Sequence, residues 1–227
     1  MDIIYWGNFI LIPIAILEFI LGLYIIFRKP RSAVSISFAI LCFSVALWVL
    51  SNGLGYILEK STFRWVLYNM VFLAASMIAG SFLYFSWVFP FKSKIIRLRD
   101  YLLVILPVVF FGATLIFTDW FIKGLDYSQK ITQYYFGFLY HVFAVYFILF
   151  WVSAFINLVI KYRKSDGIHR WQLKYLLVGV FLSSIFGMGY NLVIPWVSGL
   201  TVQTYDFFGP GSSIIWLGLV SYIIWKK

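Results

Sequence analysis

The chain has 227 residues, of which 63% are hydrophobic, 22% aromatic and only 11% charged. A soluble domain carries about 25% charged residues, because its surface faces water. This composition excludes an ordinary soluble enzyme, a nucleic-acid-binding domain and a disordered regulator, so we expect no nucleic-acid partner. The formal net charge of +10 fits basic segments held against an anionic membrane surface.

Seven runs of mostly apolar residues are each long enough to form a helix across a membrane. A spanning helix needs roughly 20 residues, because the hydrocarbon layer is about 30 Å thick and each residue adds about 1.5 Å. Each run is too long and too continuous for a strand of a membrane barrel. The sequence therefore predicts an all-α polytopic membrane protein, with one seven-transmembrane helix bundle over residues 1–227. The predicted spans are 3–27, 34–58, 65–89, 101–118, 135–160, 171–197 and 208–225.

Lysine and arginine alternate between rich and poor connections along the chain. The first, third and fifth connections, the start of the sixth span and the C-terminus together hold 14 of the 18 basic residues. The positive-inside rule places the side rich in these residues in the cytoplasm. We therefore expect an N-terminus outside the cell and a cytoplasmic C-terminus. The longest connection, 119–134, is predicted to be a loop.

Small residues at helical spacing indicate where the helices approach one another. Inside lipid, contacts between helices depend on close approach and on polar side chains that bond across helices. The sixth span carries small or polar residues at every fourth position from 179 to 191. The residues expected to pack helices together are Gly22, Gly179, Ser183, Gly187 and Gly218.

Glu18 is the only acidic residue well inside a predicted span. A charged side chain there costs about 2.5–3.5 kcal/mol on insertion scales, so we expect the carboxyl to be protonated, hydrogen-bonded or in contact with a wet cavity. Two interpretations stay open. Glu18 is either a proton-sensing or ligand-binding acid, or a neutral carboxyl bonded to a nearby serine or asparagine.

Five further polar side chains map to the outer third of the predicted bundle when depth is counted from the span ends. We expect them either to line a common small-ligand site or to form scattered hydrogen bonds between helices. One is a histidine, the side chain that changes charge near neutral pH. The five are Asn52, Asn69, His141, Tyr190 and Asn191.

The sequence contains no pattern typical of an enzyme or a metal site. No spacing of His, Cys, Asp and Glu suits a metal, and there is no glycine-rich phosphate loop and no nucleophile elbow. Cys42 is the only cysteine, which excludes an internal disulfide. We therefore predict no catalytic residue, no cofactor and no enzymatic activity.

Several short segments occur in a characteristic order. The second span contains SVALW at 44–48, the third ends in an aromatic run at Phe89-Pro90, and the seventh opens with FGP at 208–210. Between them, basic residues at 161–164 precede RWQLKY at 170–175, and Asn191 and Pro195 follow. In this order and spacing the chain resembles the N-terminal seven-transmembrane sensor region of bacterial histidine kinases.

The resemblance implies a sensing module in the inner (plasma) membrane, which receives a signal and passes it through its last helix to a cytoplasmic effector. The sequence ends at Lys227 without a phospho-acceptor helix or nucleotide-binding domain. We therefore expect a kinase or signalling domain in cis or in trans, an unknown small ligand, and the lipid bilayer as surroundings. Two alternatives stay open: a small transporter or permease, in which Glu18 serves the translocation path, and a non-catalytic membrane scaffold.

Overall fold

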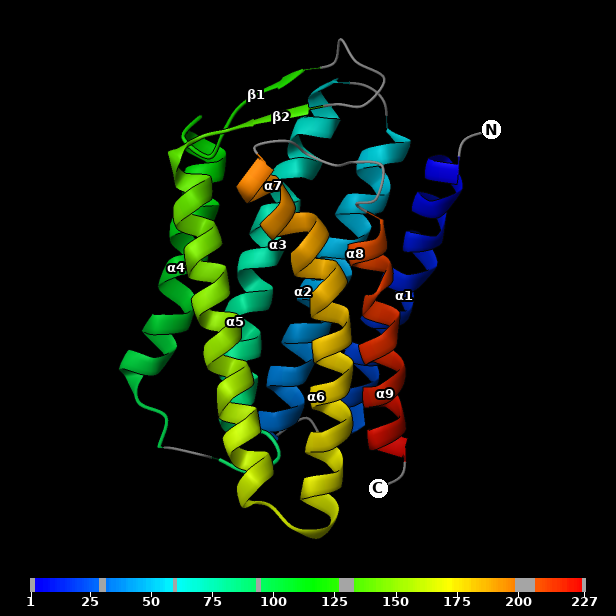
Figure 1. The fold of residues 1–227 in the computed structure, drawn as a ribbon, viewed down its shortest axis with the longest axis vertical. Coiled ribbons are helices and arrows are strands. Elements are labelled where there is room, and N and C mark those ends of the chain that lie inside the picture. The colour runs from blue at the N-terminus through cyan, green and yellow to red at the C-terminus, as the bar shows by residue number, and fades with distance from the viewer. Residues whose placement is uncertain are drawn as a thin grey trace.

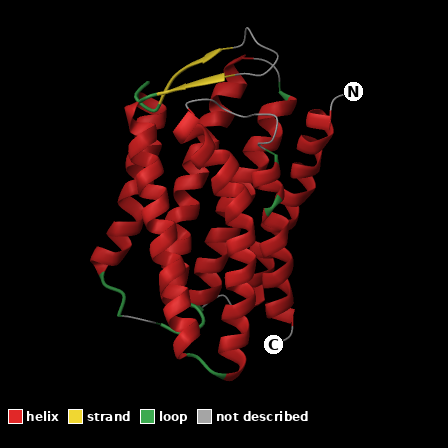
Figure 2. Ribbon diagram, viewed as in Figure 1, coloured by secondary structure: helices red, strands yellow, loops and turns green. Residues whose placement is uncertain are grey.

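The structure is a computed structural model, and it describes residues 3–28, 32–58, 61–92, 95–126, 133–198 and 207–225. Helices fill most of its length, and a two-stranded sheet lies at the end where the N-terminus is found (Figure 1 and Figure 2). The C-terminus lies at the opposite end. Six helices in the described part are long and apolar enough to cross a membrane, which confirms the predicted all-α polytopic class.

The elements follow one another with short connections. The first four are α1 (Ile3–Arg28), α2 (Ala33–Ile57), α3 (Ser61–Val88) and α4 (Leu98–Phe117). Strands β1 (Ile122–Asp126) and β2 (Gln133–Phe136) lead into α5 (Phe138–Lys164). Helix α6 (Gly167–Met188) continues through the π-helical segment η1 (Gly189–Val193) into α7 (Ile194–Ser198). The last two are α8 (Phe208–Gly211) and α9 (Ser213–Trp225).

Six helices form a closed ring, and α4 packs outside it. Around the ring α1 contacts α2, α2 contacts α3, α3 contacts α5, α5 contacts α6, α6 contacts α9, and α9 contacts α1. Helix α4 packs on α3. In this order α2 and α6 face each other across the interior of the ring.

The buried side chains fall into two clusters. The larger joins all six helices of the ring and includes Phe82 of α3, Leu176 of α6 and Trp216 of α9. The second is aromatic and joins α3, α4 and α5 to the β-hairpin. Its rings pack edge to face: Phe111 and Phe143 have centroids 5.3 Å apart, the geometry that aromatic quadrupoles favour.

The connection over 119–134 differs from the predicted loop, because it contains β1 and β2 paired antiparallel. The fifth span, predicted from residue 135, begins instead at Phe138, since Tyr135 and Phe136 belong to β2. Gly137 separates strand from helix, and a Cβ there would overlap the carbonyl group of Trp120. An apolar run continues through this boundary, so hydropathy alone could not find it.

The ends of the fifth and sixth predicted spans also differ from the prediction. Helix α5 continues to Lys164 and α6 begins at Gly167, so many of the basic residues assigned to the fifth connection lie on helix ends. Gly167 has φ of +54°, a conformation that favours glycine. The predicted seventh span is helical from Phe208 to Trp225, with a turn at Ser212. Its apolar stretch, Phe208–Val220, is shorter than the other six.

Candidate functional site

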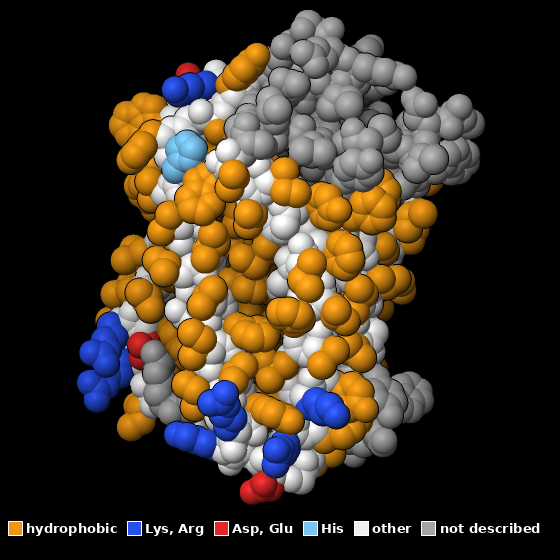
Figure 3. Space-filling view, in the orientation of Figure 1, with side chains coloured by type: hydrophobic (Ala, Val, Ile, Leu, Met, Phe, Trp, Pro, Cys, Tyr) orange, Lys and Arg blue, Asp and Glu red, His pale blue; other side chains and the backbone are white. Residues whose placement is uncertain are grey.

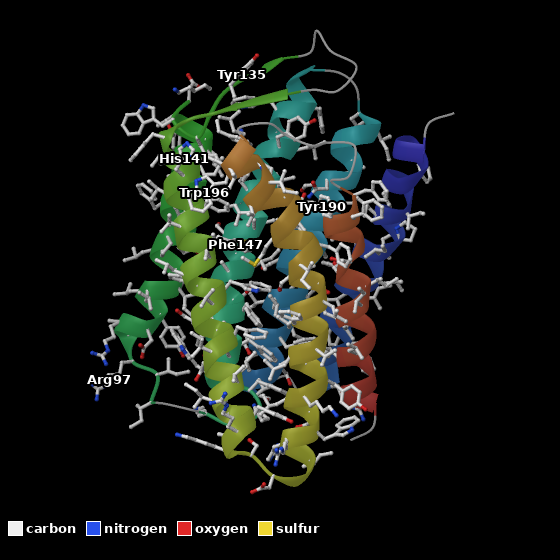
Figure 4. The ribbon with its side chains drawn as sticks, viewed as in Figure 1. Arg97, Tyr135, His141, Phe147, Tyr190 and Trp196 are labelled. Atoms are coloured by element: carbon white, nitrogen blue, oxygen red, sulfur yellow. The ribbon has the colours of Figure 1, made fainter. Side chains whose placement is uncertain are left out.

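A cavity of about 150 Å³ lies inside the ring. Its walls come from α2, α3, α5, α6, η1 and the α8–α9 segment, and most of the lining side chains are apolar. Phe147 of α5 is one of them and lies on the side of its helix that faces α6 (Figure 4). The aromatic lining of the cavity also includes Trp48, Trp151 and Trp216. The polar residues of the lining include serines, two asparagines and Tyr68.

Three of the serines in the lining use their hydroxyls on backbone carbonyls. Ser184 donates to the carbonyl of Val180 at 2.5 Å, one turn earlier in α6. Ser183 donates to the carbonyl of Ser212 at 2.8 Å, and the Ser212 hydroxyl donates to that of Gly209 at 2.6 Å. The Ser183–Ser212 bond ties α6 to the junction of α8 and α9.

The amides of Asn52 and Asn191 line the same cavity. Asn52 donates its Nδ2 to the carbonyl of Trp48 at 2.8 Å, so its amide oxygen remains available as an acceptor. Asn191 lies in η1, and its buried Nδ2 has no hydrogen-bond partner within the described part of the chain. The amide rests against Gly209 of α8, where a Cβ would overlap it.

The π-helical segment has a local cause. Pro195 has no N–H to donate, so the regular bonding pattern cannot continue through it. In η1 the N–H of Ile194 bonds instead to the carbonyl of Gly189, five residues back. Such π-helical turns inside α-helices are frequent at functional sites.

The contact between Trp48 and Gly187 shows the depth at which the amides of Asn52 and Asn191 lie in the bundle. The Trp48 ring lies 3.8 Å from the position that a Cβ would take at Gly187. Asn52 and Asn191 each follow four residues later, and α2 and α6 run in the same direction (Figure 1). The two amides therefore lie at similar depth, toward the end of the bundle that carries the hairpin.

The structure does not bring all five predicted polar residues together. Only Asn52 and Asn191 line the cavity. His141 is exposed on the outside of α5, where it is visible beside the hairpin end (Figure 3 and Figure 4). Asn69 is buried and Tyr190 packs on Phe208, with ring centroids 6.2 Å apart, but neither is among the lining residues. Counting from the span ends gives the depth of a residue but not the rotation of its helix. The outward orientation of His141 was therefore not predicted.

Glu18 is fully buried between α1, α2 and α9. The Cys42 thiol lies near its carboxyl and the Ser213 hydroxyl faces it. Neither carboxyl oxygen, nor the Ser213 hydroxyl, makes a hydrogen bond with any described residue. An ionised carboxylate in such a place lacks compensation for its lost hydration. Because Ser213 also lines the cavity, Glu18 is one side chain away from it.

The glycines expected at helix contacts fall into two groups. A Cβ at Gly22 would lie 2.7 Å from the Phe43 ring of α2. A Cβ at Gly179 would lie 2.9 Å from the Leu219 side chain of α9. Gly218 differs from the expectation, because it is exposed and a Cβ there would meet no described atom within 4 Å. It lies two positions after the buried Trp216, on the outer side of α9.

Sequence reasoning missed the role of Lys161, which it assigned to a basic connection. Lys161 is buried, and its Nζ donates to the carbonyl oxygens of Trp87 at 3.0 Å, Phe89 at 2.6 Å and Phe91 at 2.6 Å. One turn earlier, Asn157 donates to the carbonyl of Ser86 at 2.8 Å. A signal did exist: a polar pair four residues apart near the end of an apolar helix.

Apolar walls and a few fixed amide groups give the cavity the chemistry of a binding site for a small molecule. No cluster of three or more His, Cys, Asp or Glu residues that could hold a metal occurs among residues that the structure describes. What distinguishes the cavity is that one wall belongs to α9, through Ser213 and Trp216.

Comparison with known proteins identifies the family. A family model described as the N-terminal 7TM region of histidine kinase matches residues 10–224. No curated protein and no solved structure matches the chain. The match spans nearly the whole chain and includes the segments on which the resemblance rests. The multi-pass helical bundle of the structure agrees with it. The chain therefore belongs to the family of N-terminal seven-transmembrane regions of histidine kinases, which are membrane sensing modules.

Proposed function

We propose that the chain is a signal-receptor module of the bacterial inner membrane that passes its signal through α9 to a cytoplasmic kinase or signalling domain, in cis or in trans. The observation that carries this proposal is the position of α9. Trp216 and Ser213 line the cavity, while the same helix continues to the end of the bundle where basic residues gather. A ligand in the cavity would therefore touch the helix that leads out of it.

A ligand shifts an equilibrium only by its difference in affinity for the two states. In this module the two states would differ in how α9 packs on α6. The contacts that such a shift must change are the Ser183–Ser212 hydrogen bond and the close approach of Leu219 to Gly179. Both lie on the α6 face that also lines the cavity.

Seven spans with the N-terminus outside complete the proposal. Its support is charge: basic side chains gather at the end of the bundle opposite the hairpin (Figure 3). Those on α5 and α6 at that end include Arg163, Lys164, Arg170 and Lys174. Under the positive-inside rule this end is cytoplasmic, and α9 crosses as the seventh span.

Cysteine labelling tests this orientation in a Cys42→Ser background, which removes the buried thiol. Lys123→Cys in β1 and Lys164→Cys at the end of α5 are both exposed positions at opposite ends of the bundle. We expect a membrane-impermeant maleimide to label Lys123→Cys in intact spheroplasts and Lys164→Cys only after permeabilisation. The reverse pattern contradicts the orientation.

Purification from the native membrane tests the function. With an affinity tag added at the native locus, we expect incubation with labelled ATP to give an acid-labile phosphohistidine on the tagged polypeptide or on one that copurifies. Absence of such a kinase, together with solute uptake by proteoliposomes that depends on Glu18, overturns the proposal in favour of a transporter.

A further inference from the structure

We propose that the cavity binds a small aromatic molecule that carries a hydrogen-bond donor, a phenol-like ligand that enters from the bilayer between α5 and α6. The proposal rests on the proposed receptor function and names the ligand class of its cavity. Four observations carry it: the size of the cavity, its aromatic walls, an amide oxygen that is not otherwise used, and the half-buried lining between α5 and α6.

The size limits the ligand to about one ring. The cavity measures about 150 Å³. An apolar cavity of about this volume in a protein interior stays dry and binds a benzene-sized molecule. The walls match such a guest, because Phe72, Phe82, Phe143, Phe147 and Trp151 present rings to the space. Aromatic rings pack on one another edge to face or offset, which favours an aromatic guest.

One polar group in the lining is arranged as an acceptor. The Nδ2 of Asn52 is committed to the Trp48 carbonyl at 2.8 Å, and this bond fixes which end of the amide is nitrogen. Its oxygen makes no hydrogen bond that the described part of the chain shows. The hydroxyls of Ser183, Ser184 and Ser212 are oriented by donating to carbonyls, and the Ser213 hydroxyl faces Glu18. We therefore assign the donor of the ligand to the Asn52 oxygen, an amide acceptor whose orientation is fixed.

The route to the cavity lies between α5 and α6. On this side the cavity is lined by half-buried side chains: Phe147 and Trp151 on α5, and Ser184 and Met188 on α6. The space-filling view shows a strip of apolar side chains between these two helices (Figure 3). A ligand dissolved in the bilayer could pass here without crossing a polar barrier.

The cavity also places the guest against the output helix. Trp216 of α9 lines it, and Gly187 of α6 opens it opposite Trp48. The lack of a side chain at position 187 leaves the Trp48 ring 3.8 Å from where a Cβ would stand. An alanine fits this space at ordinary contact distance, whereas a leucine would occupy the volume that we assign to the ligand.

Fluorine NMR of the full chain in nanodiscs tests the proposal with two probes of matched shape, 4-fluorophenol and 4-fluorotoluene. We expect saturable binding of 4-fluorophenol to the wild type and to Gly187→Ala, and loss of that binding in Gly187→Leu. In case Gly187→Leu does not fold, Ala75→Leu fills the same cavity from α3. Empty nanodiscs measure partition into lipid.

The acceptor is tested by Asn52→Leu, with Asn69→Leu as the control because Asn69 is a buried asparagine outside the lining. We expect Asn52→Leu to weaken the binding of 4-fluorophenol about threefold to tenfold, as the loss of one hydrogen bond does. The affinity for 4-fluorotoluene should not change. Asn69→Leu should change the affinity for neither probe.

Three results overturn the inference: no saturable binding beyond empty nanodiscs, equal binding by the folded cavity-filling variant, or no preference for the phenol. The last result would assign the cavity to an apolar group such as a lipid chain. The assay contains no kinase and the kinase assay contains no probe, so failure here is distinguishable from failure of the receptor function.

Discussion

At the scale of single residues, Lys161 shows how a cation can be structural inside this bundle. Helix α3 ends at Val88, and its last carbonyl groups have no partner within the helix. The ammonium group of Lys161 satisfies the carbonyls of Trp87, Phe89 and Phe91, and so fastens α3 to α5. Lys164, one turn later, is exposed and makes no such contact in the described part.

We therefore expect Lys161→Met to lower the free energy of unfolding by about 3 kcal/mol, because charge-assisted bonds are lost and buried carbonyls stay unpaired. Lys164→Met is the matched control and should change it by less than about 0.5 kcal/mol. Unfolding in mixed micelles measures both. Equal effects of the two substitutions would show that the hydrogen bonds of Lys161 do not contribute to the free energy of unfolding.

Glu18 carries the second prediction at this scale. Its carboxyl is fully buried beside Cys42 and Ser213, with no hydrogen bond from described groups. Glutamine keeps the shape and removes the titratable proton. We expect Glu18→Gln to fold and to abolish the pH dependence of kinase output, measured on the complex from native membranes. A pH profile identical to that of the wild type would leave Glu18 with a packing role only.

At the scale of elements, the contact between α6 and α9 decides how the output helix is held. Gly179 lets α9 approach so closely that a Cβ would lie 2.9 Å from Leu219 and 3.3 Å from the Trp216 backbone. The Ser183–Ser212 hydrogen bond holds the same pair of helices one turn further on. The side chain of Leu219 can move, but the backbone of Trp216 can yield only if α9 itself shifts.

Two glycine substitutions compare the inner and outer faces near this contact. We expect Gly179→Ala to cost about 1–2 kcal/mol of unfolding free energy, as overpacking does, and to displace α9. Gly218→Ala should be neutral or should stabilise by up to about 1 kcal/mol, because the added Cβ meets no atom that the structure describes and alanine favours helix. Chemical denaturation in micelles measures both. A harmless Gly179→Ala would mean that α9 is not held closely.

At the scale of the whole molecule, hydropathy predicted the helices well and their rotations poorly. A span must be apolar along its whole length, so its range can be read from the sequence. Lipid and protein interior are both apolar, however, so hydrophobic patterning does not say which side faces inward. His141 and Gly218 were expected to face inward and are exposed.

The cavity escaped prediction for a related reason. Its lining comes from several helices and depends on the rotation of each, which no local pattern encodes. Asn52 and Asn191 were found because polar residues are rare in spans. The aromatic walls were not predicted, because nothing in the sequence distinguishes Trp48, Trp151 and Trp216 from the many other apolar residues of the spans. The hairpin was missed because its strands are short and adjoin an apolar run.

If α9 carries the signal out of the bundle, a change in the helical phase of the residues that follow it must change the output. One alanine inserted after Trp225 rotates whatever follows by about 100°, and four alanines return it nearly to the original face. We expect the first insertion to lock or invert kinase output in native membranes, and the second to restore regulation substantially. Output that is unaffected by either insertion would contradict transmission through α9.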